Sequence, residues 1–285
     1  SGDHMNPVAA ATQSSTPQSH GPSHMIFDRS PAQEPLMTNV HNSTRTVTIL
    51  KTEIQACLAG VGPMIVYQPI VHLETGLSIG AEAFSRFPGA ASTGAWFEAA
   101  EWYGLGADLE MRAVELTIAR RATWPTPWKM VCLNISPHQI ADPRLDALLE
   151  PYTGRWTVLE LTDQTALPDQ LVLQQRLEQL RQRGLRVALS GLASRDDLPR
   201  LRRIQPEIVK LDPRLTASLM IKDTTALRFV EEIMTRGRRD GALVVAVGIE
   251  NAEQLDIARA IGIEAVQGYH VGKPQPLDTL IAALA

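Results

Sequence analysis

The sequence predicts an α/β protein built around a modified (β/α)8 barrel with an antiparallel first strand. Three observations lead to this fold: eight short apolar or β-branched runs, amphipathic stretches of helical period between most of them, and a very short connection between the first two runs. Strands that alternate with helices form a parallel sheet, and eight strands in the roughly 240 residues after position 45 match a closed barrel better than an open sheet.

The eight runs expected to form strands are 64–71, 77–84, 129–135, 156–161, 186–190, 208–211, 243–247 and 265–269. Only residues 72–76 separate the first two, which is too short for a crossover helix. These two strands are therefore expected to pair as an antiparallel hairpin.

Five stretches between the later strands have the apolar spacing of helices: 107–121, 168–183, 198–204, 224–239 and 251–261. Asn251, followed by Gln254 three residues later, is a helix start signal, and glycines at 184, 241 and 262 stand where helices should end.

Residues 1–45 differ in composition from the rest, being rich in Ser, Thr, Pro, Gln, His and Asn. Such a segment cannot bury enough apolar surface to offset its ordering entropy, so we expect a disordered tail. The stretches SGDHM and GPSHM resemble cloning scars, so part of this tail is attributed to cloning. The barrel domain is expected over residues 46–285.

Composition and charge exclude several classes of protein. Hydrophobic residues make up 44% of the chain, and 27 basic against 31 acidic residues give a net charge of −4. This balance argues against a nucleic-acid-binding protein, and the seven arginines between Arg181 and Arg203 are interpreted as solvated helix faces. No apolar run reaches the roughly 18 residues of a membrane segment. Cys57 and Cys132 lack metal-type spacing and suit reduced thiols in a cytoplasmic protein.

In a barrel of this type, the carboxyl ends of the strands carry the functional site. The last polar side chains of the expected strands, or those just beyond them, are Glu82, Arg86, Asn134, Glu160, Lys210, Asp212 and Gln267. Carboxylates and an amide suit a hard divalent cation, whereas Lys and Arg suit a phosphate.

Seven motifs that contain or flank these residues occur in a fixed order: YQPIV at 67–71 with GAEAFSR at 80–86, LNIS at 133–136, LELT at 159–162, IVKLD at 208–212, VAVGIE at 245–250 and VQGY at 266–269. Together they resemble the EAL domain, the cyclic di-GMP phosphodiesterase family, with Phe84 in place of the family's Leu. The resemblance extends from about Met64 to Pro276.

The resemblance implies a barrel with an antiparallel first strand and hydrolysis of cyclic di-GMP by a water held between two Mg2+ or Mn2+ ions. By position, Glu82, Asn134 and Glu160 resemble metal ligands, and Lys210 resembles the group that assists the water. The expected set of ligand-binding residues is Gln68, Glu82, Phe84, Arg86, Asn134, Glu160, Lys210 and Gln267.

The departures from the family pattern decide the expected chemistry. The family's pair of aspartates after the fifth strand is replaced by Ser190 and Gly191 in a loop one residue shorter, and an acidic residue of the seventh strand is replaced by Val247. Without these carboxylates we expect no bound metal cofactor and no catalysis, with Glu82 and Lys210 as vestiges of the catalytic machinery and Glu82, Asn134 and Glu160 as vestiges of the metal site.

The sequence therefore favours an inactive EAL-like domain that binds cyclic di-GMP and signals to an unidentified protein partner. The alternative is a protein-interaction domain that has lost the nucleotide, and the least favoured is an active phosphodiesterase. A homodimer is compatible with either of the first two hypotheses.

Overall fold

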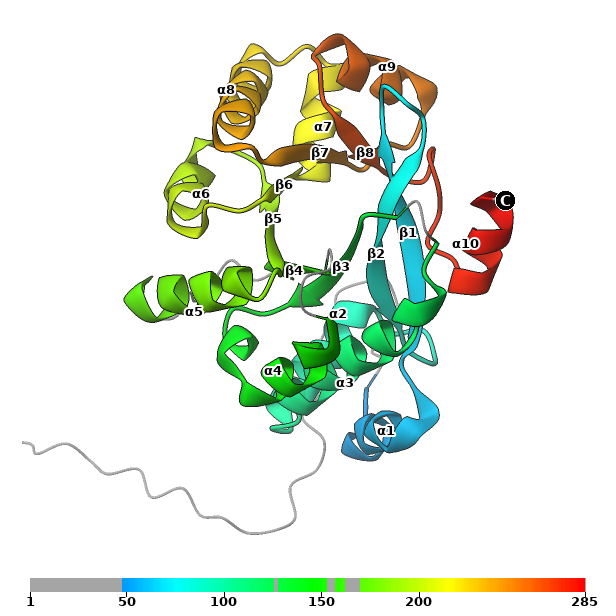
Figure 1. Ribbon diagram of the computed structural model, residues 1–285. Helices are drawn as coiled ribbons and strands as arrows, with labels where there is room; N and C mark the ends of the chain where they lie inside the picture. The colour runs from blue at the N-terminus through cyan, green and yellow to red at the C-terminus, as the bar shows by residue number, and fades with distance from the viewer. Residues whose placement is uncertain (1–47, 126–127, 153–156, 162–169, 285) are drawn as a thin grey trace, which may run out of the picture. The chain divides into compact units, whose positions relative to one another are not determined.

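The computed structural model describes residues 48–125, 128–152, 157–161 and 170–284. Within these residues, eight strands close a barrel in sequence order (Figure 1). The strands are β1 (Met64–His72), β2 (Ser78–Arg86), β3 (Met130–Ile135), β4 (Thr157–Leu161), β5 (Arg186–Leu192), β6 (Ile208–Leu211), β7 (Leu243–Val247) and β8 (Ala265–Gln267). The predicted tail and Trp156 lie outside the described residues.

The expected antiparallel first strand is confirmed. β1 pairs antiparallel with β2 on one side and with β8 on the other, and every other neighbouring pair is parallel. The short turn between His72 and Ser78 is the reason, because it brings the second strand straight back along the first. The last strand is shorter than predicted and ends at Gln267, so Tyr269 belongs to the following turn.

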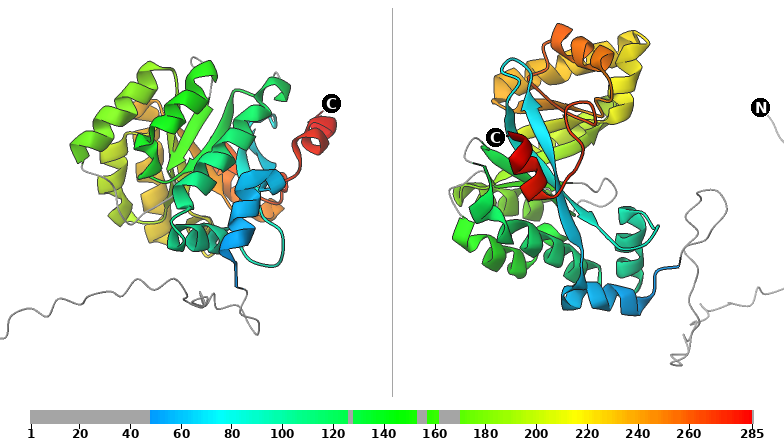
Figure 2. Two further views of the ribbon diagram at one scale, coloured as in Figure 1. Left: turned by 90° about the horizontal axis from the view of Figure 1, so that it is seen from below. Right: turned by 90° about the vertical axis from the view of Figure 1, so that its right-hand side faces the viewer.

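The helices surround the barrel (Figures 1 and 2). They are α1 (Lys51–Ala56), α2 (Thr93–Trp102), α3 (Gly106–Ala119), α4 (Pro143–Leu149), α5 (Gln170–Gln182), α6 (Leu198–Ile204), α7 (Pro213–Met220), α8 (Thr224–Asp240), α9 (Ala252–Ala260) and α10 (Leu277–Leu284). The five predicted helices correspond to α3, α5, α6, α8 and α9. The predicted start of α5 at Pro168 lies outside the described residues.

Two of the missed helices begin with the same signal. Asp142 and Asp212 each precede a proline, and each carboxylate accepts the backbone N–H two residues later at 2.8 Å, from Arg144 and Arg214 respectively. An Asp cap followed by Pro at the first helical position is a favoured helix start. Asp212, which the sequence placed among the site candidates, therefore caps α7 instead.

A layer of apolar side chains fills the middle of the barrel. It consists of Ile70, Met130, Cys132, Val158, Ala188, Ile208, Val245 and Ala265. β2 contributes Gly80 at this level, where a Cβ would overlap the carbonyl oxygen of Met130. Because Gly80 has no side chain, β2 can approach β3 closely. The packed apolar layer supports the residues at the carboxyl ends of the parallel strands.

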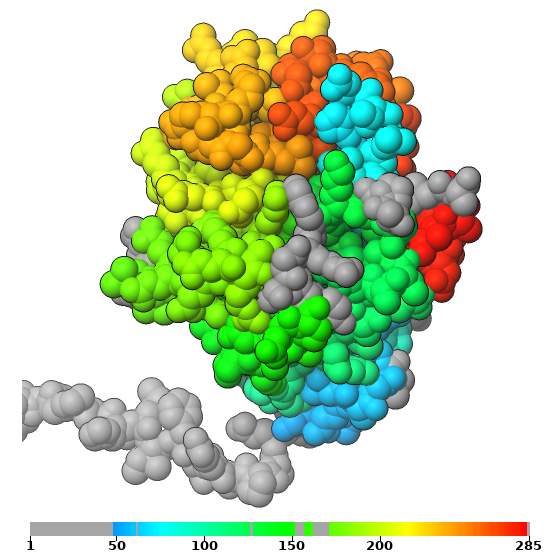
Figure 3. All heavy atoms as spheres, in the orientation of Figure 1, coloured from blue at the N-terminus to red at the C-terminus, as the bar shows by residue number. Residues whose placement is uncertain are grey.

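The outer surface of the barrel is formed by helices. Figure 3 shows one face, on which α5, α6 and α8 follow one another as adjoining bands. Among the described residues, no helix has the length and apolar character needed to cross a membrane.

Candidate functional site

One residue from each strand lies a single layer above the apolar core, toward the carboxyl ends of the parallel strands. These eight residues, which we call the polar ring, are Gln68, Glu82, Asn134, Glu160, Ser190, Lys210, Val247 and Gln267. On the parallel strands each follows a core position by two residues, as 134 follows 132, and in antiparallel β1 the order is reversed. The period of two in a β-strand therefore places all eight side chains at one level.

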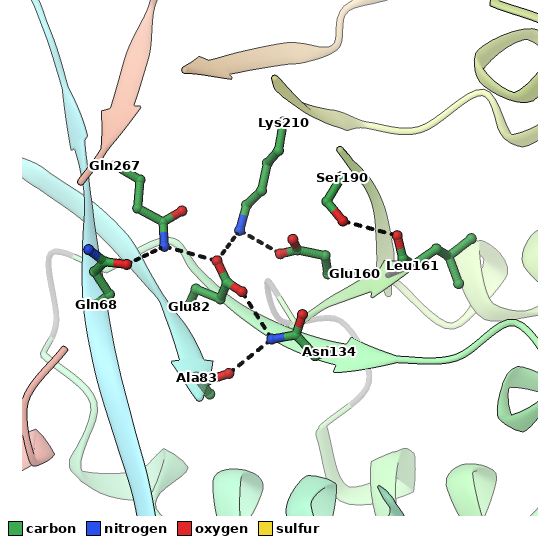
Figure 4. A network of polar contacts seen from close by, with 9 residues as sticks. All are labelled: Gln68, Glu82, Ala83, Asn134, Glu160, Leu161, Ser190, Lys210 and Gln267. Carbon is green, nitrogen blue, oxygen red and sulfur yellow. Dashed lines mark hydrogen bonds and ion pairs between the residues drawn. The ribbon is translucent and has the colours of Figure 1, made fainter. Parts of the chain in front are cut away.

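Lys210 on β6 is the centre of the polar ring (Figure 4). Its ammonium group donates to Glu82 Oε2 at 2.6 Å and to Glu160 Oε2 at 2.5 Å. All three side chains are buried, with Lys210 only 1% exposed. One buried cation thus bridges two buried carboxylates, one from β2 on the opposite side of the barrel and one from β4, two strands away.

Amide side chains complete the hydrogen bonding of Glu82. Gln267 Nε2 donates to Glu82 Oε2 at 2.9 Å and to Gln68 Oε1 at 3.1 Å, and Asn134 Nδ2 donates to Glu82 Oε1 at 3.0 Å. Gln68 Nε2 in turn donates to the carbonyl of Gly272 at 2.9 Å. The side-chain oxygen Oε1 of Gln267 is buried and has no hydrogen-bond partner among the residues that the structure describes, whereas its backbone carbonyl accepts from the Ile249 N–H at 3.1 Å.

Glu82 and Glu160 together carry two negative charges when ionised, whereas Lys210 carries one positive charge. Burial, together with the charge of Glu82, raises the pKa of Glu160 to about 7, although Lys210 and Ser190 oppose this change. Burial lowers the pKa of Lys210, but Glu160 and Glu82 outweigh it and hold that pKa above its ordinary value. Lys210 is therefore charged at neutral pH, and Glu160 is poised to take up a proton.

The β5 position of the polar ring carries a hydroxyl. Ser190 Oγ donates to the carbonyl of Leu161 at 3.2 Å, so the side chain is engaged with the neighbouring strand. The pairing of β5 with β6 is irregular between Leu189 and Leu192, and Gly191 has a φ of 71°, which is unfavourable for other residues. The β5 end therefore bulges at the two positions where the family pattern has aspartates.

A buried arginine supports this bulge, and the sequence interpretation missed it. Arg200 on α6 is 8% exposed and donates from Nη2 to the carbonyl of Ser190 at 2.6 Å. The prediction that the arginines of this region form solvated helix faces is wrong for Arg200. Arg200 stands three residues after Asp197, and this spacing was the available signal that Arg200 packs against the loop. The Asp197 carboxylate accepts hydrogen bonds from the Ala193 and Ser194 N–H groups of that loop.

Phe84 and Arg86 continue the inward-facing side of β2 beyond Glu82. The guanidinium carbon of Arg86 lies 5.6 Å from the centre of the Phe84 ring, and Arg86 Nη1 donates to the carbonyl of Ser85 at 2.9 Å. Both side chains are partly exposed. They place an aromatic face and a positive charge at the rim of the polar ring.

The structure thus brings six of the eight predicted ligand-binding residues into the polar ring, and the other two lie at its rim on β2. Within the described part of the chain, which omits residues 162–169, no group of three or more His, Cys, Asp or Glu side chains is placed to hold a metal ion. Val247, at the β7 position, is paired in register with Gln267 and supplies an apolar side chain.

Comparison with known proteins agrees with this architecture. The chain is 29% identical over 252 residues to an uncharacterized protein of Mycobacterium tuberculosis (strain H37Rv), with 80% of each chain covered. It is also 29% identical over 193 residues to the cyclic di-GMP phosphodiesterase PdeF of Escherichia coli, which covers 62% of this chain and 25% of that protein. A relative from Sinorhizobium fredii, matched over 246 residues, is likewise covered over 30% of its length.

Solved structures share the fold. The EAL domain of Xanthomonas citri FimX in complex with c-di-GMP superposes with a TM-score of 0.69 at 22% identity, covering 79% of this chain and 92% of that one. The PaMucR phosphodiesterase in complex with c-di-GMP superposes with a TM-score of 0.67 at 24% identity, covering 80% and 98%. The sequence profile of the EAL domain matches residues 59–274, and the chain therefore belongs to the EAL domain family.

Proposed function

We propose that this EAL domain binds cyclic di-GMP without hydrolysing it and acts as a receptor in bacterial second-messenger signalling. The observation that carries the proposal is the position of Lys210, whose ammonium group lies between Glu82 and Glu160. No carboxylate comes from the β5 or β7 position of the polar ring, where Ser190 and Val247 stand.

The donor set of the polar ring does not fit a pair of divalent cations. Two carboxylates and one ammonium group sum to a charge of −1, whereas two such cations bring four positive charges and require oxygen ligands that bridge them. Lys210 also occupies one oxygen of each carboxylate. Asn134 and the two glutamates remain as vestiges of the family's metal site, and we propose no metal cofactor and no catalytic role for Glu82 or Lys210.

Binding of the nucleotide needs fewer groups than its hydrolysis. Arg86 offers a positive charge to a phosphate, and Phe84 offers an aromatic face to a base. The absence of the β5 and β7 carboxylates also removes charges that would repel two phosphates. FimX and PaMucR, which share the fold, are described in complexes with c-di-GMP.

A receptor must signal to another molecule that the nucleotide is bound, and we propose that this molecule is a protein partner. The cytoplasm is the proposed compartment, because this is where a cyclic dinucleotide messenger would meet the domain. Neither the partner nor a homodimer is needed for the ligand contacts described above.

Isothermal titration of the full chain with cyclic di-GMP, in EDTA and again with Mg2+, tests the proposal. We expect saturable binding in EDTA at micromolar or lower concentration, lost in Arg86→Ala and kept in Arg228→Ala, a matched change of an exposed arginine on α8. Chromatography of the nucleotide after incubation with Mn2+ should show no linear product.

Hydrolysis that depends on Mn2+ and disappears in Glu82→Ala would contradict the claim of inactivity. Absence of binding in both buffers would overturn the receptor and leave a domain that acts through protein contacts alone.

A further inference from the structure

A strongly exposed aromatic side chain follows the carboxyl end of β8. Tyr269 is 59% exposed, although Gln267, two residues earlier, is completely buried in the polar ring. The Lys273 ammonium lies 5.8 Å from the centre of the Tyr269 ring, within cation–π range. An aromatic face with an adjacent cation therefore stands in the turn directly after the polar-ring residue Gln267, and the proposed function above makes no use of it.

Backbone hydrogen bonds hold the turn that carries Tyr269. The His270 N–H donates to the Ile249 carbonyl at 2.9 Å, and the Gly272 N–H donates to the Gly268 carbonyl at 3.0 Å. At Gly268 a Cβ would overlap the backbone of Ile249, so this close contact requires glycine. The backbone beneath Tyr269 is thus ordered in advance, and little entropy is lost there when a molecule binds.

The same turn is tied directly to the polar ring. Gln68 Nε2 donates to the carbonyl of Gly272, and Gln68 Oε1 accepts from Gln267. Gln267 also bonds Glu82, so three ring residues connect the turn to β2. Tyr269 stands two residues after Gln267, in the turn that begins where β8 ends.

Two pairs of similar chemistry flank β1. On the β2 side, Arg86 lies against Phe84, and on the β8 side, Lys273 lies against Tyr269. β1 is the strand between them, because it pairs with both β2 and β8. Each pair offers a π surface for a base and a cation for a phosphate, and hydrogen bonds through Gln68, Gln267 and Glu82 connect the two sides.

We propose that Tyr269, together with Lys273, is a second base-stacking surface of the ligand site. Cyclic di-GMP has two purine bases and two phosphates, so one base would stack near Phe84 and Arg86 and the other on Tyr269 beside Lys273. This inference rests on the proposed function and extends it by naming a ligand-binding residue that neither the sequence interpretation nor the polar ring includes.

The test is isothermal titration of the full chain with cyclic di-GMP in EDTA. Loss of one stacked base contact typically costs about 1–3 kcal/mol, so Tyr269→Ala should weaken binding by about fivefold to 150-fold. Tyr269→Phe should recover most of this loss, because the π face returns. Trp102→Ala, which removes another exposed aromatic side chain, on α2, should leave the affinity unchanged.

A ligand with one base separates the two surfaces. GMP can occupy only one stacking surface at a time, so it should bind more weakly than cyclic di-GMP and lose less than the dinucleotide does in Tyr269→Ala. Circular dichroism of each variant verifies that the fold is kept, which the exposure of Tyr269 leads us to expect.

The outcomes distinguish the two proposals. If the unaltered chain binds cyclic di-GMP, Arg86→Ala abolishes binding and Tyr269→Ala does not change it, the second stacking surface is refuted while the receptor stands. If the unaltered chain does not bind cyclic di-GMP, both proposals fall. If Tyr269→Ala and Trp102→Ala weaken binding equally, the effect is not specific to the turn after β8 and the inference is again refuted.

Discussion

The two sides of the polar ring differ in how their side chains are satisfied. On β1, β2, β3 and β8, the amides of Gln68, Asn134 and Gln267 bond one another and Glu82. On β5 and β7, which flank Lys210, Ser190 bonds a backbone carbonyl and Val247 is apolar. Neither ring position beside Lys210 carries a charge, and both of its partners lie on β2 and β4. The comparison shows that the charged contacts of the ring run across the barrel, whereas the amide contacts join neighbouring strands.

Removing the cation tests this dependence most severely. Lys210→Met leaves Glu82 and Glu160 buried together without a counter-charge, so we expect a loss of about 3–5 kcal/mol in the free energy of unfolding. Urea denaturation at pH 8 measures it, with Lys51→Met, an exposed position on α1, as the control. Adding Glu82→Gln and Glu160→Gln to Lys210→Met should restore part of the loss. Equal losses in Lys210→Met and Lys51→Met would show that the bridge is not needed for stability.

Returning carboxylates to the β5 and β7 side should create a cation site. In the double variant Ser190→Asp, Val247→Glu the charge of the polar ring changes from −1 to −3, so the variant should be destabilised in EDTA and stabilised by Mn2+. At a Mn2+ concentration about 100 times the dissociation constant, the gain is about 2.7 kcal/mol. Thermal denaturation with and without Mn2+ measures it against the unaltered chain, for which we expect little change. A double variant that is insensitive to Mn2+ would show that the missing carboxylates are not sufficient to explain the altered site.

The raised pKa of Glu160 predicts a pH dependence of smaller size. Because this pKa is about 7 in the folded chain and near 4.5 in the unfolded one, the folded state binds the proton more tightly. The stability it contributes is present below about pH 4.5 and is lost as the pH rises through about 7, with a loss of about 2.5 kcal/mol between pH 5 and pH 8. Urea denaturation between pH 5 and 8 should show this decline, and Glu160→Gln should remove it while Glu98→Gln, an exposed control, should not. An unchanged slope in Glu160→Gln would contradict the assignment.

The smallest effect is expected at the β5 hydroxyl. Ser190→Ala removes one neutral hydrogen bond to the Leu161 carbonyl, which should cost about 1 kcal/mol. Thermal denaturation against Ser218→Ala, whose hydroxyl bonds a carbonyl on the exposed face of α7, separates the site from an ordinary helix position. A cost above about 3 kcal/mol would mean that Ser190 has a larger role in holding the bulge than its single bond implies.

The barrel could be predicted from sequence because its signals are local. Eight apolar runs and a five-residue connection determine the number of strands and the antiparallel start, and positive-φ glycines at 184, 241 and 262 mark helix ends as expected. α4 and α7 have only seven and eight residues, and they were missed because the Asp-Pro start signals before them were not used. The end of β8 was placed two residues late because the turn at Gly268 depends on contact with Ile249, which lies in another segment.

The membership of the polar ring could also be predicted in large part, because strand ends in a barrel converge. What the sequence did not reveal is the bonding within the ring. The contacts of Lys210 with Glu82 and Glu160 depend on distances across the barrel. The burial of Arg200 depends on how α6 packs on β5. Spacing along the chain carries no information on either contact.

The reversed direction of β1 has a structural consequence. Met64, its first residue, is paired with Arg86, the last residue of β2, so the chain enters the barrel at the same end as the ligand site. In an all-parallel barrel the first strand would start at the opposite end, a full strand length away. Here α1 is joined through residues 57–63 to the end of the barrel that carries the polar ring, so the chain before β1 and the ring lie at the same end.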